Sequence, residues 1–125
     1  MPVSSKKILI IEDEKILAEM YKDRFSEEGF RVALAGSSEE GFNLLQKETP
    51  DLILLDILLP KANGISFLKK IKEQSKLSSI PVVAFSNYDE PKTKKEAESF
   101  GVKEYLLKTD FTPQDLVNKI KGYLT

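Results

Sequence analysis

Charged or hydroxyl side chains end or follow four of the chain's short apolar runs. They are Glu12 and Asp13 after KILII, Asp56 at the end of LILLD, Ser86 after VVAF, and Lys108 after YLL. A charge in an apolar stretch is costly without a partner, and grouped carboxylates repel one another unless a cation lies among them. If the fold brings these residues together, they form a cation site with a positive side chain beside it.

The available ligand types point to a hard cation and to phosphoryl chemistry. The chain has no Cys and no His, which excludes thiolate and imidazole ligands and catalysis by either group. Mg²⁺ prefers oxygen ligands and keeps several waters, so we expect Asp13 and Asp56 to bind it directly, with Mn²⁺ as the alternative ion. An aspartate in this setting can attack phosphorus, while Mg²⁺ and Lys108 neutralise the phosphoryl oxygens and Ser86 binds them.

Taken singly, each of these residues has an ordinary structural explanation. Glu12 or Asp13 could favour the N-terminus of a following helix, Ser86 could begin a turn, and Lys108 could be solvated. Their shared position after apolar runs is what favours a joint site.

Five short apolar runs, separated by helix-length segments, provide the framework for this site. The runs cover residues 6–11, 30–35, 51–56, 80–85 and 102–107. Three of them lack alternation of apolar and polar residues, which is typical of parallel strands covered on both faces. We therefore predict a doubly wound α/β domain, whose ligands bind beyond the carboxyl ends of the strands.

Helical segments between these runs show apolar stripes and capping residues. Ser37 and Thr112 are expected to cap two helices. Residues 89–100 offer few apolar side chains, so we expect this helix to be loosely held. The residues expected to face the core on the first and last helices are Leu17, Met20, Tyr21, Phe25, Leu116, Ile120, Tyr123 and Leu124.

Length and charge favour one soluble domain without affinity for polyanions. The 125 residues suffice for a single domain, 1–125, in which residues 1–5 are expected to be disordered. The net charge of −1 gives no general attraction to nucleic acid or to an anionic membrane. No signal peptide or membrane-length apolar segment is present, so we expect a cytoplasmic protein.

Four motifs, in order along the chain, resemble the receiver domain of two-component response regulators. They are ILIIEDE, DILLPKANG, FS and YLLK, and the resemblance runs from about Lys6 to Leu124. It implies a flavodoxin-like sheet of five parallel strands in the order 2-1-3-4-5, flanked by five helices. The chain is most similar to stand-alone receivers of the chemotaxis-regulator type.

The resemblance also implies a role for each residue at the acidic end of the site. Asp56 would be the phosphoacceptor. Asp13 would bind Mg²⁺ directly, Glu12 would bind it through water, and Leu58 would contribute its backbone carbonyl.

Further roles carry over to the residues around the phosphoryl group. Ser86, Lys108 and the backbone of Asn87 would bind its oxygens. Tyr105 would be the switch residue, turning inward when Ser86 moves toward the phosphate.

Two of the departures from the family's pattern affect the loops at the site. Thr109 follows Lys108 where the family usually has a cis-proline; a non-proline cis bond costs about 2.5 to 4 kcal/mol, so we expect a trans bond and a shifted loop. Asn87 replaces a smaller residue and would narrow the path to the site. Pro60 and Gly64, by contrast, match the family and would shape the loop after Asp56.

The function implied is that of a phosphorylation-controlled interaction module without an output domain. It would receive its phosphoryl group from a histidine kinase or a phosphotransfer protein and change its affinity for a downstream protein. It would catalyse only its own phosphorylation and dephosphorylation, as a monomer or a phosphorylation-dependent dimer.

Two alternatives remain open on the sequence. A degenerate receiver would bind partners without phosphorylation, as the departures at Asn87 and Thr109 allow. A small Mg²⁺-dependent phosphatase of the haloacid dehalogenase type would use similar residues. That family expects a second acidic residue two positions after the nucleophile, where this chain has Leu58.

Overall fold

The computed structural model describes residues 6–57, 64–87 and 89–124, in which strands and helices alternate along the chain. The strands are β1 (Lys7–Ile11), β2 (Arg31–Ala35), β3 (Leu52–Asp56), β4 (Val82–Ser86) and β5 (Glu104–Leu107). The helices are α1 (Lys15–Glu27), α2 (Ser38–Lys47), α3 (Gly64–Lys72), α4 (Pro91–Ser99) and α5 (Pro113–Leu124), with a short 3₁₀ helix, η2 (Lys108–Asp110), after β5.

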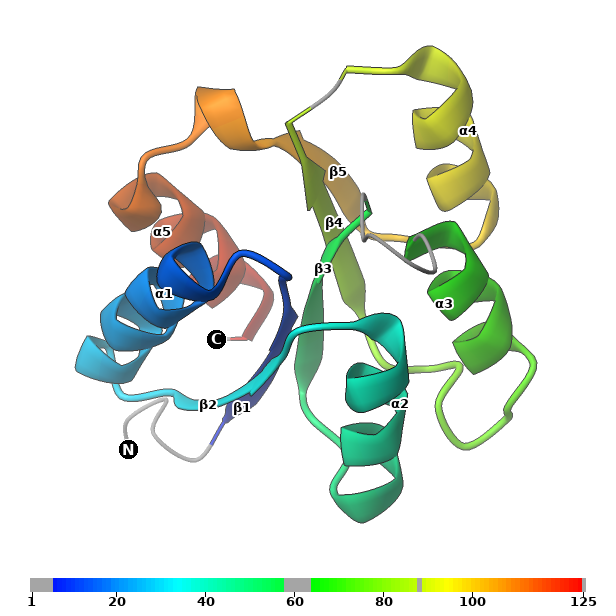
Figure 1. The fold of residues 1–125 in the computed structure, drawn as a ribbon, viewed down its shortest axis with the longest axis horizontal. Helices are drawn as coiled ribbons and strands as arrows, with labels where there is room; N and C mark the ends of the chain where they lie inside the picture. The colour runs from blue at the N-terminus through cyan, green and yellow to red at the C-terminus, as the bar shows by residue number, and fades with distance from the viewer. Residues whose placement is uncertain (1–5, 58–63, 88, 125) are drawn as a thin grey trace.

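All five strands are parallel and form one sheet in the order β2-β1-β3-β4-β5. Helices α1 and α5 cover one face, and α2, α3 and α4 cover the other (Figure 1). The doubly wound fold and the strand order expected from the sequence are confirmed.

The sheet separates two apolar layers. Every residue of β3 and β4 is buried, as continuous apolar runs require when helices cover both faces. Leu54 and Phe85 pack toward α1 and α5, whereas Leu55 and Ala84 pack toward α2, α3 and α4. Because side chains alternate along a strand, Asp56 belongs to the same face as Leu54.

Side-chain caps fix the starts of α2 and α5. The Ser37 hydroxyl accepts a hydrogen bond from the Glu40 N–H at 3.1 Å. At α5 the cap is reciprocal: the Asp115 N–H donates to the Thr112 hydroxyl at 3.0 Å, and the Thr112 N–H donates to the Asp115 carboxylate at 3.1 Å. Both caps match the sequence prediction.

Two side chains expected in the core lie at the surface instead. Met20 is 36% exposed, because the buried face of α1 is set by Ala18, Tyr21 and Phe25, and Met20 lies about 100° round the helix from Tyr21. Tyr123 is 37% exposed, and its hydroxyl donates to the Glu104 carboxylate, which holds the ring at the surface of α5.

Helix α4 contacts the domain lightly, in line with its composition. Ala97 is its one buried residue among the nine that the structure places in this helix. Across the described residues, no helix is long and apolar enough to cross a membrane.

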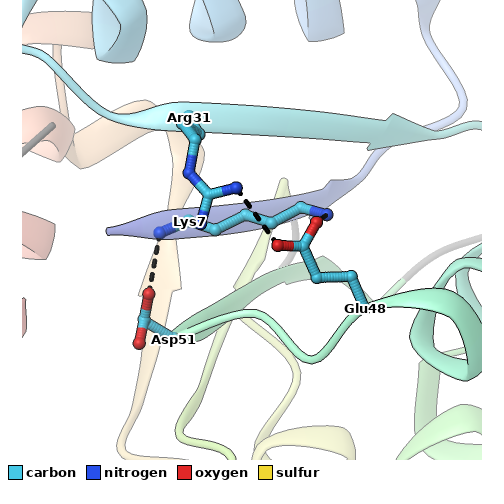
Figure 2. Close-up of polar contacts among 4 residues, drawn as sticks. All are labelled: Lys7, Arg31, Glu48 and Asp51. Atoms are coloured by element: carbon cyan, nitrogen blue, oxygen red, sulfur yellow. Dashed lines mark hydrogen bonds and ion pairs between the residues drawn. The ribbon is translucent and has the colours of Figure 1, made fainter. Parts of the chain in front are cut away.

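A group of charged residues ties the amino-terminal end of the sheet together (Figure 2). The Lys7 ammonium and the Arg31 guanidinium bind the two oxygens of Glu48, at 2.6 and 3.1 Å. These hydrogen bonds hold the pKa of Glu48 below its usual value. The Lys7 backbone N–H donates to Asp51 at 2.8 Å, immediately before β3. Asp51 and Asp56 therefore lie at opposite ends of the same strand.

Gly64 begins α3 where the chain passes close to the end of β3. Its N–H donates to the Ile57 carbonyl at 2.7 Å, and a Cβ there would lie 2.8 Å from the Ile57 Cα and 3.1 Å from the Asp56 carbonyl oxygen. A methyl group at this position forces the backbone beside Asp56 to move.

We therefore expect Gly64→Ala to lower the free energy of unfolding by about 1 to 3 kcal/mol. Gly122→Ala is the matched control, since a Cβ there meets nothing within 4 Å; it should stabilise α5 by up to about 1 kcal/mol. Urea denaturation of both variants measures the difference. Equal effects would show that the close approach at Gly64 has no energetic consequence.

Candidate functional site

Three carboxylates meet at the carboxyl edge of the sheet. Glu12 directly follows β1, and Asp56 ends the neighbouring β3, with Ile11 and Leu55 in register just before them. Asp13 follows Glu12, and one oxygen from each of the three lies within 4.8 Å of the others. Glu12 and Asp56 are 1% and 4% exposed, whereas Asp13 is exposed. The parallel pairing of β1 with β3 thus concentrates negative charge in a largely buried place.

Lys108 supplies the opposite charge. Its ammonium lies 2.7 Å from Glu12 Oε1 and 3.2 Å from Asp56 Oδ2. Burial favours the neutral amine, but the hydrogen bond to Glu12 and the charge of Asp56 outweigh it and raise the pKa of Lys108. The lysine therefore stays protonated and bridges β1 and β3 from beyond the end of β5.

For Glu12, burial is the dominant influence on the pKa. It raises the pKa of Glu12 from 4.5 to about 7, helped by the nearby charge of Asp56, although the hydrogen bond from Lys108 acts in the other direction. One ammonium does not compensate two buried carboxylates. The remaining negative charge of the site therefore favours binding of a further cation or protonation of a carboxylate.

Two aromatic side chains, Phe85 and Tyr21, pack against each other beside the Lys108 ammonium. We call this pair the aromatic floor. The Lys108 nitrogen lies 4.8 Å from the centroid of the Phe85 ring, within cation–π range. Tyr21 meets Phe85 edge to face, with centroids 5.6 Å apart and planes at 68°. Sequence spacing alone does not place either residue at the site.

Ser86 and Tyr105, on the neighbouring strands β4 and β5, form a second polar pair. Ser86 ends β4 and is fully buried, and Tyr105 on β5 is half-buried. Burial raises the pKa of the Tyr105 hydroxyl, although its hydrogen bond with the Ser86 side chain opposes this. The proposed switch residue is thus already linked to Ser86.

The two departures from the family's pattern lie at the surface. Asn87 and Thr109 are both exposed. The structure contains no cis peptide bond among the residues it describes, so the Lys108–Thr109 bond is trans, as expected, and the chain continues into η2. Leu58 and Pro60, for which the sequence predicted a metal contact and a loop-shaping role, lie outside the described residues.

The donor set suits Mg²⁺. Asp13 and Asp56 offer carboxylate oxygens directly, and Glu12 lies within reach of the same point. A cleft of about 370 Å³ borders Glu12 and Asp13 and has Ala18 and Leu34 among its lining residues. It gives solvent and small ions access to the acidic group, and a bound Mg²⁺ would supply positive charge to phosphoryl oxygens there.

A parallel sheet whose carboxyl edge presents three carboxylates, a hydroxyl and a lysine is the arrangement found in phosphoacceptor signalling domains. The profile of the response regulator receiver domain matches residues 8–121, and the chain belongs to this family. Phosphorylation and Mg²⁺ binding are general features of the family. The fold and family are those of a receiver rather than of an enzyme family such as the haloacid dehalogenases.

Among curated relatives, the chain resembles transcriptional regulators. It is 38% identical to the transcriptional regulatory protein YcbL of Bacillus subtilis, over 91% of this chain and 49% of that protein. It is 34% identical to the phosphate regulon transcriptional regulatory protein PhoB of Escherichia coli, over 96% of this chain and 52% of that protein. The chain thus spans about half the length of these relatives.

Solved structures agree on the fold. A CheY-like receiver domain protein from Methanospirillum hungatei superposes with a TM-score of 0.87 at 28% identity, covering 95% of this chain and 93% of that one. The chemotaxis protein CheY4 of Vibrio cholerae gives a TM-score of 0.87 at 25% identity, covering 95% and 98%.

The raised pKa of Glu12 predicts how stability depends on pH in metal-free protein. Between about 4.5 and about 7 the folded state holds a proton that the unfolded chain has lost, so stability falls as the pH rises through this window. This group contributes a decrease of up to about 1.4 kcal/mol per pH unit. Urea denaturation in a chelator across this range should show a shallower decline for Glu12→Gln than for wild type. Parallel curves would mean that Glu12 titrates as it does in the unfolded chain.

Proposed function

We propose that Asp56 accepts a phosphoryl group from a histidine kinase or a phosphotransfer protein in a Mg²⁺-dependent reaction. The observation that carries this proposal is the position of Asp56 at the end of β3, with the Lys108 ammonium 3.2 Å from its Oδ2 and two further carboxylates alongside. A carboxylate oxygen attacks phosphorus, the bond from phosphorus to the donor atom breaks, and the leaving group takes the electron pair.

The chain's own residues have separate tasks in this step. Asp13 and Asp56 would bind the cation directly, Glu12 would bind it through water, and the family resemblance implies the backbone carbonyl of Leu58 as a further ligand. Lys108 neutralises a phosphoryl oxygen as negative charge shifts toward the leaving group.

Ser86 and the backbone N–H of Asn87 bind the remaining phosphoryl oxygens. Ser86 has a single O–H to donate, so once that O–H is given to a phosphoryl oxygen, the hydrogen bond with Tyr105 persists only if the Tyr105 hydroxyl is its donor. Phosphorylation therefore biases the position of Tyr105 and of the lightly packed α4, and this changes the affinity for a downstream protein.

That the receiver acts without an output domain stays a prediction, as does its cytoplasmic location. The same holds for the monomer, or phosphorylation-dependent dimer, and for the absence of direct nucleic-acid binding. The relatives YcbL and PhoB are about twice as long and carry names of transcriptional regulators. The mass of the polypeptide isolated from its own cells would decide the first point.

Intact-mass spectrometry tests the proposed reaction. The protein is incubated with acetyl phosphate in Mg²⁺ or in a chelator and quenched in acid. We expect a mass gain of one phosphoryl group that requires Mg²⁺. No gain in either sample, with other small acyl or amido phosphates also tried, would favour the phosphorylation-independent binding module instead.

A further inference from the structure

Lys108 reaches its partners by crossing a neighbouring strand. It follows β5, whereas Asp56 ends β3, and β4 lies between them in the sheet. Two strand spacings amount to about 10 Å, so the lysine side chain must pass over β4 to reach Asp56. Figure 1 shows β4 between β3 and β5 at this edge.

Phe85 is the β4 residue that lies along this path. It is in register with Asp56 on one side and with Leu106 on the other, and its ring belongs to the layer facing α1 and α5. The Lys108 ammonium lies 4.8 Å from the centroid of this ring. The ring thus borders the route of the lysine from β5 to Asp56.

The ammonium is therefore held from two directions. Glu12 and Asp56 accept its hydrogen bonds, and the Phe85 ring, over which the ammonium lies, attracts it as well. Such an attraction is strongest where water is excluded, and the Lys108 side chain is only 7% exposed.

Tyr21 fixes the orientation of the Phe85 ring. The two rings form a T-shaped pair with their planes at 68°, and both residues are buried. An edge-to-face pair resists rotation of either ring, because the rotation would lose the contact. The contact with Tyr21 therefore restricts the orientation of the Phe85 ring.

We infer that Phe85, braced by Tyr21, is a positioning residue for phosphoryl transfer: its ring face keeps the Lys108 ammonium beside Asp56. This inference rests on the proposed function. Without the ring, the closer hydrogen bond to Glu12, at 2.7 Å, would draw the ammonium away from Asp56, where a phosphoryl group would need it.

Fluorination of the Phe85 ring separates its electrostatic effect from its packing. Mono-, di- and trifluorinated phenylalanine, introduced only at position 85, weaken the negative ring face with little change of shape. We expect the rate of Mg²⁺-dependent labelling by acetyl phosphate to fall with each fluorine, to roughly a tenth with the trifluorinated ring. The unfolding midpoint should stay nearly constant.

The same amino acids at Phe25 provide the control. That ring is also buried in the layer facing α1 and α5 and packs edge to face, against Phe30. Labelling should not change across the series at this position.

A second readout does not require phosphorylation. In the unphosphorylated protein, the ring current of Phe85 should shift the NMR signals of the Lys108 ε-methylene upfield, and Phe85→Leu should abolish this shift. Its absence in wild type would overturn the inference.

The outcomes distinguish the two claims. If wild type is labelled but the rate is the same for every ring at position 85, or falls only as stability falls, Phe85 is core packing and the inference is wrong. If wild type takes no label at all, the proposed function fails, and this inference fails with it.

Discussion

Asp56→Asn is expected to abolish labelling by acetyl phosphate, because an amide oxygen is too weak a nucleophile to displace the leaving group from phosphorus. The loss should reach at least about 100-fold in rate, since the whole reaction passes through this one atom. The fold should persist, because the substitution keeps the shape of the side chain and removes one of three clustered carboxylates. Acid-quenched intact-mass spectra over time measure the rate, and urea denaturation checks the fold.

Asp51→Asn is the matched control for this variant. Asp51, shown in Figure 2, stands immediately before β3, whereas Asp56 is the last residue of β3, so the two aspartates lie at opposite ends of this strand. Labelling should be unchanged in Asp51→Asn even if stability falls slightly. Residual labelling of Asp56→Asn at the wild-type rate would mean that another side chain is the acceptor.

Lys108→Met is expected to have the largest effect on stability. It keeps an unbranched apolar stem but leaves the buried Glu12 and Asp56 without their cation. Removing one partner of a buried ionic group costs about 3 to 5 kcal/mol, and here the lower end applies, because Glu12 can take up a proton. The loss should be greater at pH 8 than at pH 6. The pKa of Glu12 is about 7 with Lys108 beside it and rises further without the lysine, so at the higher pH the variant must either take up a proton or keep two repelling carboxylates.

The same substitution should slow labelling by about 100-fold, the typical effect of removing one donor that stabilises developing negative charge. Lys121→Met is the control: Lys121 pairs with Glu28 at 2.8 Å, but both are partly exposed, so the cost should stay below about 1 kcal/mol. Denaturant titrations at the two pH values compare them. Similar losses for both lysines, with no dependence on pH, would contradict the account of Lys108 as a buried bridge.

Much of the fold follows from the sequence because its apolar runs are unambiguous. Residues 51–56 and 80–85 are too short and too uniformly apolar to be surface helices, and most of each run forms a fully buried central strand, β3 or β4. The convergence of Glu12, Asp56 and Lys108 then follows from the rule that parallel strands present their carboxyl ends at one edge.

The errors arose where tertiary packing sets the orientation of a helix. Met20 and Tyr123 fit the helical spacing of apolar residues. That spacing does not fix which neighbouring position points most directly into the core, so the predicted buried face can be off by about one residue. The small Ala18 and the branched Val117 took the buried positions instead. For Tyr123 the polar hydroxyl was the available warning, since it needs a partner such as Glu104.

The aromatic floor could not be predicted from sequence spacing. Phe85 looks like any apolar residue of a central strand, and Tyr21 like any helix residue facing the core. Their contact with the site depends on the register of Asp56 with Phe85 and on the path of Lys108 across β4. A phenylalanine directly before Ser86 was the one local signal, and it gains meaning only once that register is known.

The central claim is that the phosphoryl group resides on Asp56, and chemical trapping tests it most directly. Borohydride reduces an acyl phosphate to an alcohol, converting a phosphorylated aspartate to homoserine, which has a lower residue mass. Trypsin separates the candidates, because Glu12 and Asp13 fall in residues 8–15 and Asp56 in residues 48–61. After Mg²⁺-dependent labelling, fragment spectra should show homoserine at position 56. Reduction at Glu12, Asp13 or Asp51 instead, or none in a protein that carries the phosphoryl mass, would contradict the account.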